Sequence, residues 1–255
     1  LWVLHTHCIQ HESWLDCSPR LVFKSPKPGC GKSTAMSVLR SMCPRSLMSS
    51  SLTGASMFRI ISEIGPSLFV DEIDSSGVLA DIGHLAKSGY KRGEAIVMRC
   101  AGSDSSDIKV EGFNVFGPLA LAGIGNRLDA ALASRCFEVT LHGRTAAEAR
   151  NSRRFKGRDQ RNLKGTLLAK AARWAVDNEG ALAAVGDMPD HGIANRDHDL
   201  AETLWTIAQV LGGNWPDALK ASLLAFSESK EDPRQRREDI LLDVIRLAHA
   251  EAEYR

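Results

Sequence analysis

Short apolar runs alternate with helical patterns along the first 140 residues. The stretches Leu21–Phe23, Ser67–Glu72 and Pro118–Asn126, the last two of which end in polar residues, predict buried strands, because a strand covered on both faces reads as a continuous apolar stretch. Helical spacing of apolar residues separates these runs, over 32–42 and again over 78–88. Strands that alternate with helices predict an α/β fold with a mainly parallel sheet flanked by helices.

Further elements complete this outline. We expect a helix near 1–15, a helix capped by Thr53 and ending at Ile64, and a hairpin formed by residues 94–99 and 108–110. After residue 144 the pattern is wholly helical, and the expected helices cover 163–175, 198–211, 216–227 and 236–252. The sequence therefore predicts a core of residues 1–143 and a C-terminal helical lid of residues 144–255.

The first strand runs into a glycine-rich loop that precedes a helix. Gly29 and Gly31 allow backbone N–H groups to converge on an anion at the start of this helix. Lys32 is placed to reach the β/γ-phosphates and Ser33 to hold Mg²⁺, although Pro26 stands where the first glycine of the phosphate-loop motif belongs. The alternative is an ordinary turn between strand and helix. The expected nucleotide-binding residues of the loop are Pro28, Gly29, Cys30, Gly31, Lys32, Ser33 and Thr34.

Two adjacent carboxylates, Asp71 and Glu72, are the last positions of the predicted strand Ser67–Glu72. On a parallel sheet the carboxyl ends of neighbouring strands meet in one crevice, so Asp71 is expected near Ser33, where both would hold Mg²⁺. Glu72 would then orient water toward the γ-phosphate. The alternative is an acidic strand end facing solvent.

Two later residues are candidates for the same chemistry. Asn126 ends the predicted strand that begins at Pro118 and is expected to sense the γ-phosphate. Arg135 follows a short helix, and we expect it to project from a subunit edge. A salt bridge at the start of the next strand is the alternative for Arg135.

Charge is balanced overall but uneven along the chain. The 255 residues carry a formal net charge of +1, which excludes a polycation that binds nucleic acid through total charge alone. Residues 144–173 contain ten Lys/Arg and two acids, so we expect a basic face that binds single-stranded DNA. Lys87, Lys91, Arg92 and Arg99 form a second candidate cluster near the predicted hairpin, with a solvated charged turn as its alternative.

The positions of the cysteines and histidines indicate the cellular compartment and whether a metal site is expected. The six cysteines include no Cys-x-x-Cys pair, which favours reduced thiols in a cytoplasm. His5, His7, Cys8 and His11 lack the second pair that a zinc site would need, so packing is the better interpretation. We expect no membrane span, and a chain that begins with Leu suggests a fragment of a longer protein.

The chain resembles an uncharacterised ATPase domain, related to the AAA+ ATPases, at the C-terminal end of phage and mobile-element primase-helicase-like proteins. The resemblance covers nearly the full length and rests on these stretches: His5–His7, Ser18–Leu21, Ser25–Ser33, Val70–Glu72, Gly123–Gly125, Leu132–Arg135, Met188–Asp190, Asn195–Arg196 and Gly212–Pro216. It implies a P-loop NTPase core, binding of ATP and Mg²⁺, and an upstream primase-like domain. By the same analogy Arg135 resembles an arginine finger in a homo-oligomer, and Arg196 a second sensor that contacts nucleotide.

The combined interpretation is a Mg²⁺-dependent ATP hydrolase, AAA+-like or helicase-like, that acts on DNA in phage or mobile-element replication. Lys32, Glu72, Asn126 and Arg135 are its expected catalytic residues. One alternative is a small-molecule kinase, against which the water-activating carboxylate argues. The other is a nucleotide-dependent switch or binding module.

Overall fold

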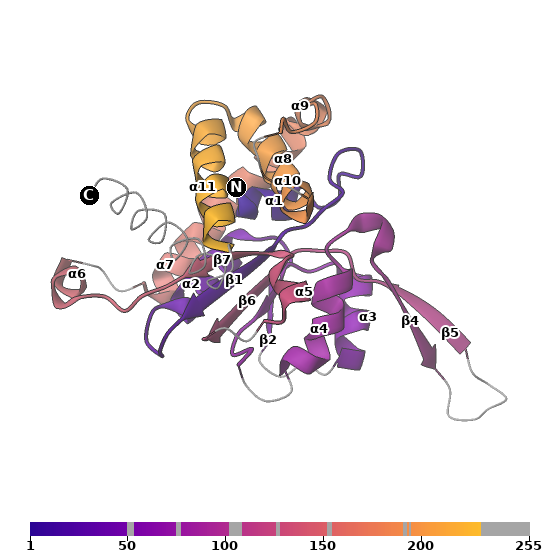
Figure 1. Ribbon diagram of the computed structural model, residues 1–255, viewed down its shortest axis with the longest axis horizontal. Coiled ribbons are helices and arrows are strands. Elements are labelled where there is room, and N and C mark those ends of the chain that lie inside the picture. Colours follow the sequence, from indigo (N-terminus) through magenta and orange to yellow (C-terminus); the bar gives the residue numbers. More distant parts are fainter. Residues whose placement is uncertain are drawn as a thin grey trace, which may run out of the picture.

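A five-stranded parallel sheet forms the centre of the molecule (Figure 1). The computed structural model describes residues 1–49, 54–74, 78–101, 109–125, 128–151, 155–190, 193 and 195–230. The strands are β1 (Arg20–Ser25), β2 (Leu47–Ser49), β3 (Leu68–Val70), β6 (Leu119–Ile124) and β7 (Cys136–Thr140). They lie in the order β2-β3-β6-β1-β7, and every neighbouring pair is parallel. The predicted α/β class with a mainly parallel sheet is confirmed.

Helices cover both faces of this sheet. On one face, α1 (Trp2–His7) and α2 (Lys32–Met42) pack against Leu21 and Phe23 of β1. On the other face, α3 (Gly54–Ile64), α4 (Val78–Ser88) and α5 (Ala130–Ala133) pack against the side that carries Val22. Alternate residues of β1 thus point to opposite layers, which is why its apolar run is continuous.

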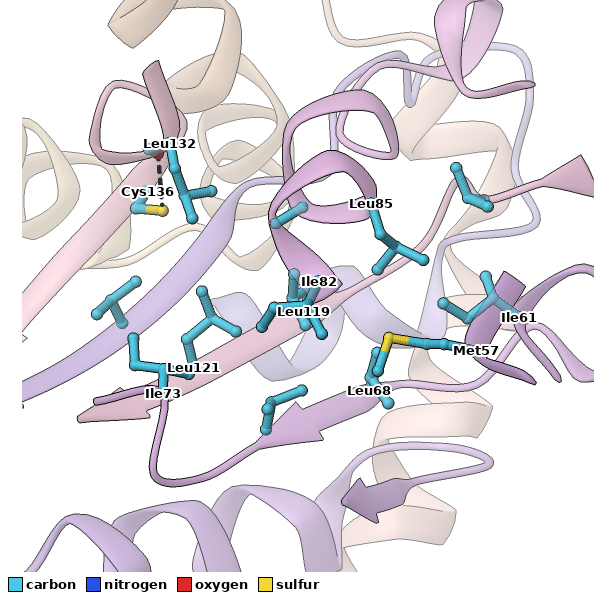
Figure 2. Packing of buried hydrophobic residues seen from close by; sticks show 14 of the residues in the cluster. Met57, Ile61, Leu68, Ile73, Ile82, Leu85, Leu119, Leu121, Leu132 and Cys136 are labelled. Carbon is cyan, nitrogen blue, oxygen red and sulfur yellow. Dashed lines mark hydrogen bonds between the residues drawn. The ribbon is translucent and has the colours of Figure 1, made fainter. Parts of the chain in front are cut away.

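The larger core cluster lies between the sheet and α3, α4 and α5 (Figure 2). Met57 and Ile61 of α3 lie near Leu68 of β3, while Ile82 of α4 lies over Leu119 of β6. Each of these side chains is at most 5% exposed. Burial at about 25 cal/mol per Å² of apolar surface makes this cluster the main stabilising element of the core.

A two-stranded antiparallel hairpin projects from the body beside α3 and α4 (Figure 1). After the 3₁₀ turn η1 (Arg92–Glu94), β4 (Ile96–Ala101) pairs with β5 (Lys109–Asn114). One face of the hairpin packs Val97 and Phe113 on the core, whereas the other face exposes apolar side chains. The exposed apolar residues are Ile96, Met98 and Val110. The predicted hairpin is confirmed.

After β7, the described elements of the chain are all helices, joined by non-helical segments. Its elements are α6 (Ala146–Asn151), α7 (Gly157–Leu163), the π-helical segment η2 (Lys164–Leu168), α8 (Ala169–Asp177), α9 (Glu179–Ala183), α10 (Asn195–Leu211) and α11 (Trp215–Lys230). α7 and η2 lie against α2, while α8 and α10 lie against α1. Leu1, Leu4 and Cys8 share apolar clusters with these helices, so the N-terminal segment and the C-terminal helices are packed together.

A buried arginine connects elements at the amino edge of the sheet, the edge where the parallel strands begin. Arg20, the first residue of β1, is 1% exposed. Its guanidinium donates to the carbonyl oxygens of Ala86 at the end of α4, of Ser18, and of Gly117 just before β6. Burial lowers the pKa of Arg20 to about 10, so the group stays charged at neutral pH. A cation at the carboxyl end of α4 also complements that helix dipole.

The structure departs from the sequence prediction at several elements. The first helix covers only residues 2–7 of the expected 1–15. The short strand β2 was not predicted, and a π-helical segment interrupts the expected helix over 163–175. Thr53 and the helix expected over 236–252 lie outside the described residues. In the described part of the chain, no helix is long and apolar enough to cross a membrane.

Candidate functional site

The loop between β1 and α2 has an open backbone. Gly29 and Gly31 adopt φ angles of +81° and +91°, a region that favours glycine. A Cβ atom built on either residue would meet no atom within 4 Å. Gly31 caps α2 without a side-chain hydrogen bond, so the first N–H groups of the helix face the loop. Cys30 lies between the two glycines and is buried, with its Sγ near Gly143.

Lys32 is held at the mouth of this loop by the last residue of β1. Its Nζ donates to the Ser25 hydroxyl oxygen at 2.6 Å, and that hydroxyl donates to the Lys27 carbonyl oxygen at 2.8 Å. The ammonium is therefore oriented across the loop. Ser25 was not among the site residues predicted from the sequence, although its place seven residues before Lys32 at the end of the strand was a usable signal.

Ser33 and Asp71 meet across the sheet. The Ser33 hydroxyl donates to Asp71 Oδ2 at 2.9 Å, and the Glu72 amide donates to Asp71 Oδ1 at 2.9 Å. Ser33 follows β1 and Asp71 follows β3, and only β6 lies between these two strands. Both residues therefore lie at the edge of the sheet where the parallel strands end. The structure thus brings together the serine and the carboxylate that the sequence paired.

Glu72 has an unusual backbone. Its φ of +58° lies in the left-handed region, and its side chain is exposed at the carboxyl edge of the sheet, the edge where the parallel strands end. A non-glycine residue in that region stores strain that the surrounding structure must hold, and such residues cluster at functional sites. Asn126, the expected sensor, lies outside the described residues.

Arg135 lies at the amino edge of the sheet. It directly precedes β7, and its carbonyl oxygen accepts from the Arg20 amide at 3.1 Å. Its guanidinium lies 4.9 Å from the Tyr90 ring centroid and donates to the Ala131 carbonyl oxygen. Its buried Nε has no hydrogen-bond partner among the described residues. The salt bridge considered as an alternative is not seen in that part of the chain.

Arg196 lies beside Arg135 and away from the loop. From the start of α10, its Nη1 donates to the Ser134 hydroxyl at 2.7 Å. Ser134 precedes β7, so this contact is at the opposite edge of the sheet from Lys32. The structure therefore does not bring Arg196 to the phosphate loop of its own chain.

The four basic residues expected to cluster near the hairpin each contact another group of the chain. The Arg92 guanidinium donates to the carbonyl oxygens of Ile9, His11 and Leu15 and lies 4.4 Å from the Phe116 ring centroid. The remaining three members are also engaged, because Lys87 pairs with Asp129, Lys91 with Glu94, and Arg99 lies over the Phe58 ring. Arg92 therefore has a structural role, because its guanidinium fixes the segment after α1.

Part of the basic stretch, residues 157–168, lies beside the loop helix. Its α7 and η2 pack along α2 (Figure 1), and Lys156, Arg158, Arg161, Lys164 and Lys170 are exposed. Arg173 is paired with Asp177 at 2.7 Å. An exposed basic surface therefore borders the helix that begins at Lys32.

The N-terminal histidines and cysteines serve packing. His7 Nε2 contacts the Met42 carbonyl oxygen at 2.8 Å, His11 pairs with Glu179, and His5 is fully buried, where desolvation lowers its pKa to about 3. No group of three potential metal ligands occurs among the described residues. Burial raises the pKa of the thiols of Cys8, Cys17 and Cys43 to about 12, and these buried thiols are unreactive.

Comparisons with known proteins give distant matches. A family model described as "Protein of unknown function (DUF3631)" matches residues 142–254, less than half of the chain. An X-ray structure of JCV helicase is 16% identical, with 89% of this chain and 61% of that chain covered and a TM-score of 0.32. The NrS-1 C-terminal region is 12% identical, with 86% and 50% covered and a TM-score of 0.36. The chain thus spans between half and two thirds of these structures, and neither its fold nor its function rests on the likeness. A comparison with curated proteins finds no match.

Proposed function

We propose that the chain is a Mg²⁺-dependent ATP hydrolase of the AAA+-like kind that acts on single-stranded DNA. The observation that carries the proposal is the 2.9 Å hydrogen bond between the Ser33 hydroxyl and Asp71 Oδ2 at the mouth of the loop. A serine and a carboxylate joined in this way, beside a glycine-rich loop and a lysine, are the ligands that a phosphate loop uses for Mg·nucleotide.

The loop fits a chain of phosphates. The positive φ angles of Gly29 and Gly31 and the open space around them leave backbone N–H groups free to converge on an anion. Cys30 and Thr34 would contribute backbone N–H groups to the same cradle, and Pro28, which has no N–H, would fix the direction of the chain entering it. Lys32, which donates to Ser25, would exchange this neutral partner for phosphate oxygens and so form a stronger, charge-assisted contact.

The carboxylates divide into two roles. Asp71 would hold the metal together with Ser33, and the metal would neutralise charge on the transferring phosphoryl group. Glu72 is exposed beside this pair, and both oxygens of Asp71 already accept hydrogen bonds. Glu72 is therefore the carboxylate suited to orient the attacking water, with Asn126 as the proposed sensor of the γ-phosphate.

Two groups of basic residues support the proposal that the protein binds DNA as a homo-oligomer. The exposed cations of residues 156–170 border α2, where they would contact phosphates of a single strand. Arg135 and Arg196 lie together at the amino edge, from which they would act on the site of a neighbouring subunit in a homo-oligomer. A primase-like domain upstream, phage or mobile-element replication and a cytoplasmic location belong to the same proposal.

The experiment measures Mg·ATP binding and phosphate release, each with and without single-stranded DNA. Lys32→Ala is expected to abolish binding or turnover and to leave the fold intact, because the half-buried Lys32 side chain lies at the mouth of the loop, outside the apolar core clusters. Glu72→Gln is expected to bind Mg·ATP and to hydrolyse it at least about a hundredfold more slowly, as when a general base is lost.

Lys220→Ala provides the matched control, since Lys220 is an exposed lysine on α11 far along the chain from the loop. Turnover by Lys32→Ala at the rate of this control would contradict the proposal. Phosphate transfer to an added small-molecule acceptor would instead support a kinase. Tight Mg·ATP binding with no phosphate release from the wild-type protein would support a switch.

A further inference from the structure

The chain after Glu72 is bound to the end of β6. The Ile73 amide donates to the Ala122 carbonyl oxygen at 3.0 Å, and Asp74 Oδ1 accepts from the Ile124 amide at 2.9 Å. Strand pairing between β3 and β6 ends with Val70 opposite Leu121. These two hydrogen bonds therefore extend the connection between the carboxylate segment and β6 beyond the sheet ladder itself.

Gly123 makes this close approach possible. A Cβ atom at position 123 would lie 2.6 Å from Ile73 Cγ1 and 3.1 Å from Asp74 Oδ1. Ile73 is 4% exposed and lies next to Leu121 in the core (Figure 2). A buried side chain cannot move aside at little cost, so only glycine at position 123 lets the segment dock in this way.

Glu72 is thus held from both sides. On one side Asp71 accepts from the Glu72 amide and from Ser33. On the other side Ile73 and Asp74 are fixed to β6. The left-handed backbone of Glu72 lies between these two anchors, and such a conformation persists only where the surroundings enforce it.

We infer that Asp74 is a positioning residue for hydrolysis, which holds Glu72 at the metal site and the end of β6 beside it. The inference rests on the proposed function. Without the Asp74 carboxylate, the Ile124 amide loses its acceptor, and among the described hydrogen bonds only that of the Ile73 amide still ties the segment after Glu72 to β6. The Glu72 carboxylate then shifts, and a misplacement of about 1 Å in a catalytic group costs on the order of a hundredfold in rate. Nucleotide binding is retained, because Lys32, Ser33 and Asp71 keep their own contacts.

The test compares Asp74→Ala with Asp74→Asn, which keeps a carbonyl oxygen able to accept from the Ile124 amide. Asp74→Ala is expected to lower kcat by about 10- to 100-fold with the dissociation constant for Mg·ATP and KM unchanged within about twofold. Asp74→Asn is expected to restore most of the lost kcat. Thermal unfolding of both variants verifies that they are folded, and Asp217→Ala, at an exposed aspartate of α11, is the matched control.

The outcomes separate this inference from the function on which it rests. Hydrolysis by Asp74→Ala at the wild-type rate overturns the positioning role and leaves the ATPase proposal standing. A parallel loss of nucleotide affinity, thermal stability and turnover in both variants also overturns it, because Asp74 would then be a structural residue. A wild-type protein that releases no phosphate from Mg·ATP overturns the proposed function, and the positioning role with it.

Discussion

The backbone of Glu72 allows a prediction in which stability and activity change in opposite directions. An L-residue in the left-handed region costs about 1–2 kcal/mol that glycine does not pay, and Glu72 has a φ of +58°. Glycine in turn lowers the free energy of unfolding by about 0.4–1 kcal/mol, because it makes the unfolded chain more flexible. Glu72→Gly and Glu72→Ala both lack the carboxylate, so their comparison isolates the backbone. The glycine variant is expected to be more stable than the alanine variant by about 1 kcal/mol.

Urea unfolding measures this difference directly, with equal m-values as the condition for comparing the two free energies of unfolding. A difference of about 1 kcal/mol corresponds to a rise of roughly 2–4 °C in Tm for a chain of this size. Lys220→Gly and Lys220→Ala form the control pair. Lys220 lies in the right-handed helix α11, where glycine is less stable than alanine by about 1 kcal/mol. The sign of the difference is therefore opposite at the two positions.

Both Glu72 variants are expected to hydrolyse ATP at least about a hundredfold more slowly than the wild type. A glycine variant that is equally stable as, or less stable than, the alanine variant would show that position 72 does not hold the left-handed conformation. The strain argument for Glu72 would then be refuted. A stabilised but inactive glycine variant would show strain retained at a functional site.

Four further outcomes follow from the contacts described above. Because His5 is neutral when folded, with a pKa of about 3, and takes up a proton when unfolded, stability falls as pH drops below 6.5. The loss is about 2 kcal/mol at pH 5, and His5→Leu removes it in urea unfolding at pH 7 and 5. Arg20→Met lowers the free energy of unfolding by roughly 3 kcal/mol or more, since three buried carbonyl oxygens lose their donor. Replacing the cations of residues 156–161 with glutamine reduces the salt dependence of single-strand binding, whereas an unchanged slope places the DNA elsewhere. Arg135→Ala mixed with Glu72→Gln regains partial hydrolysis, and no recovery in a demonstrated mixed assembly refutes action between subunits.

The middle of the central sheet could be predicted because β1, β3 and β6 are buried on both faces, whereas the short strand β2 was missed. Such strands give continuous apolar runs, and the loop glycines and the Asp71–Glu72 pair then follow at the ends of the runs. The pairing of Ser33 with Asp71 needed only the rule that parallel strands end at the same edge. These predictions succeeded because each depended on local pattern and on sheet geometry.

Predictions that depended on long-range contacts were less successful. Arg92 was expected on a charged surface, but its guanidinium satisfies three carbonyl oxygens of the segment after α1, about 80 residues away in sequence. The role of Asp74 was missed for the same reason, because its partner amide at Ile124 lies 50 residues further along the chain. A charged side chain gives no signal in the sequence of whether it meets water or a buried carbonyl group.

The position of the two edge arginines explains why assembly belongs to the proposed mechanism. Arg135 is hydrogen-bonded to Arg20 at the start of β1, whereas Lys32 contacts Ser25 at its end. At about 3.3 Å per residue, the strand between them is roughly 16 Å long, more than an arginine side chain can span. Arg196 is held at the same edge through Ser134, so neither guanidinium reaches the loop of its own chain. If either arginine contributes to hydrolysis by contacting phosphate, the phosphate must belong to a neighbouring subunit whose loop faces this edge.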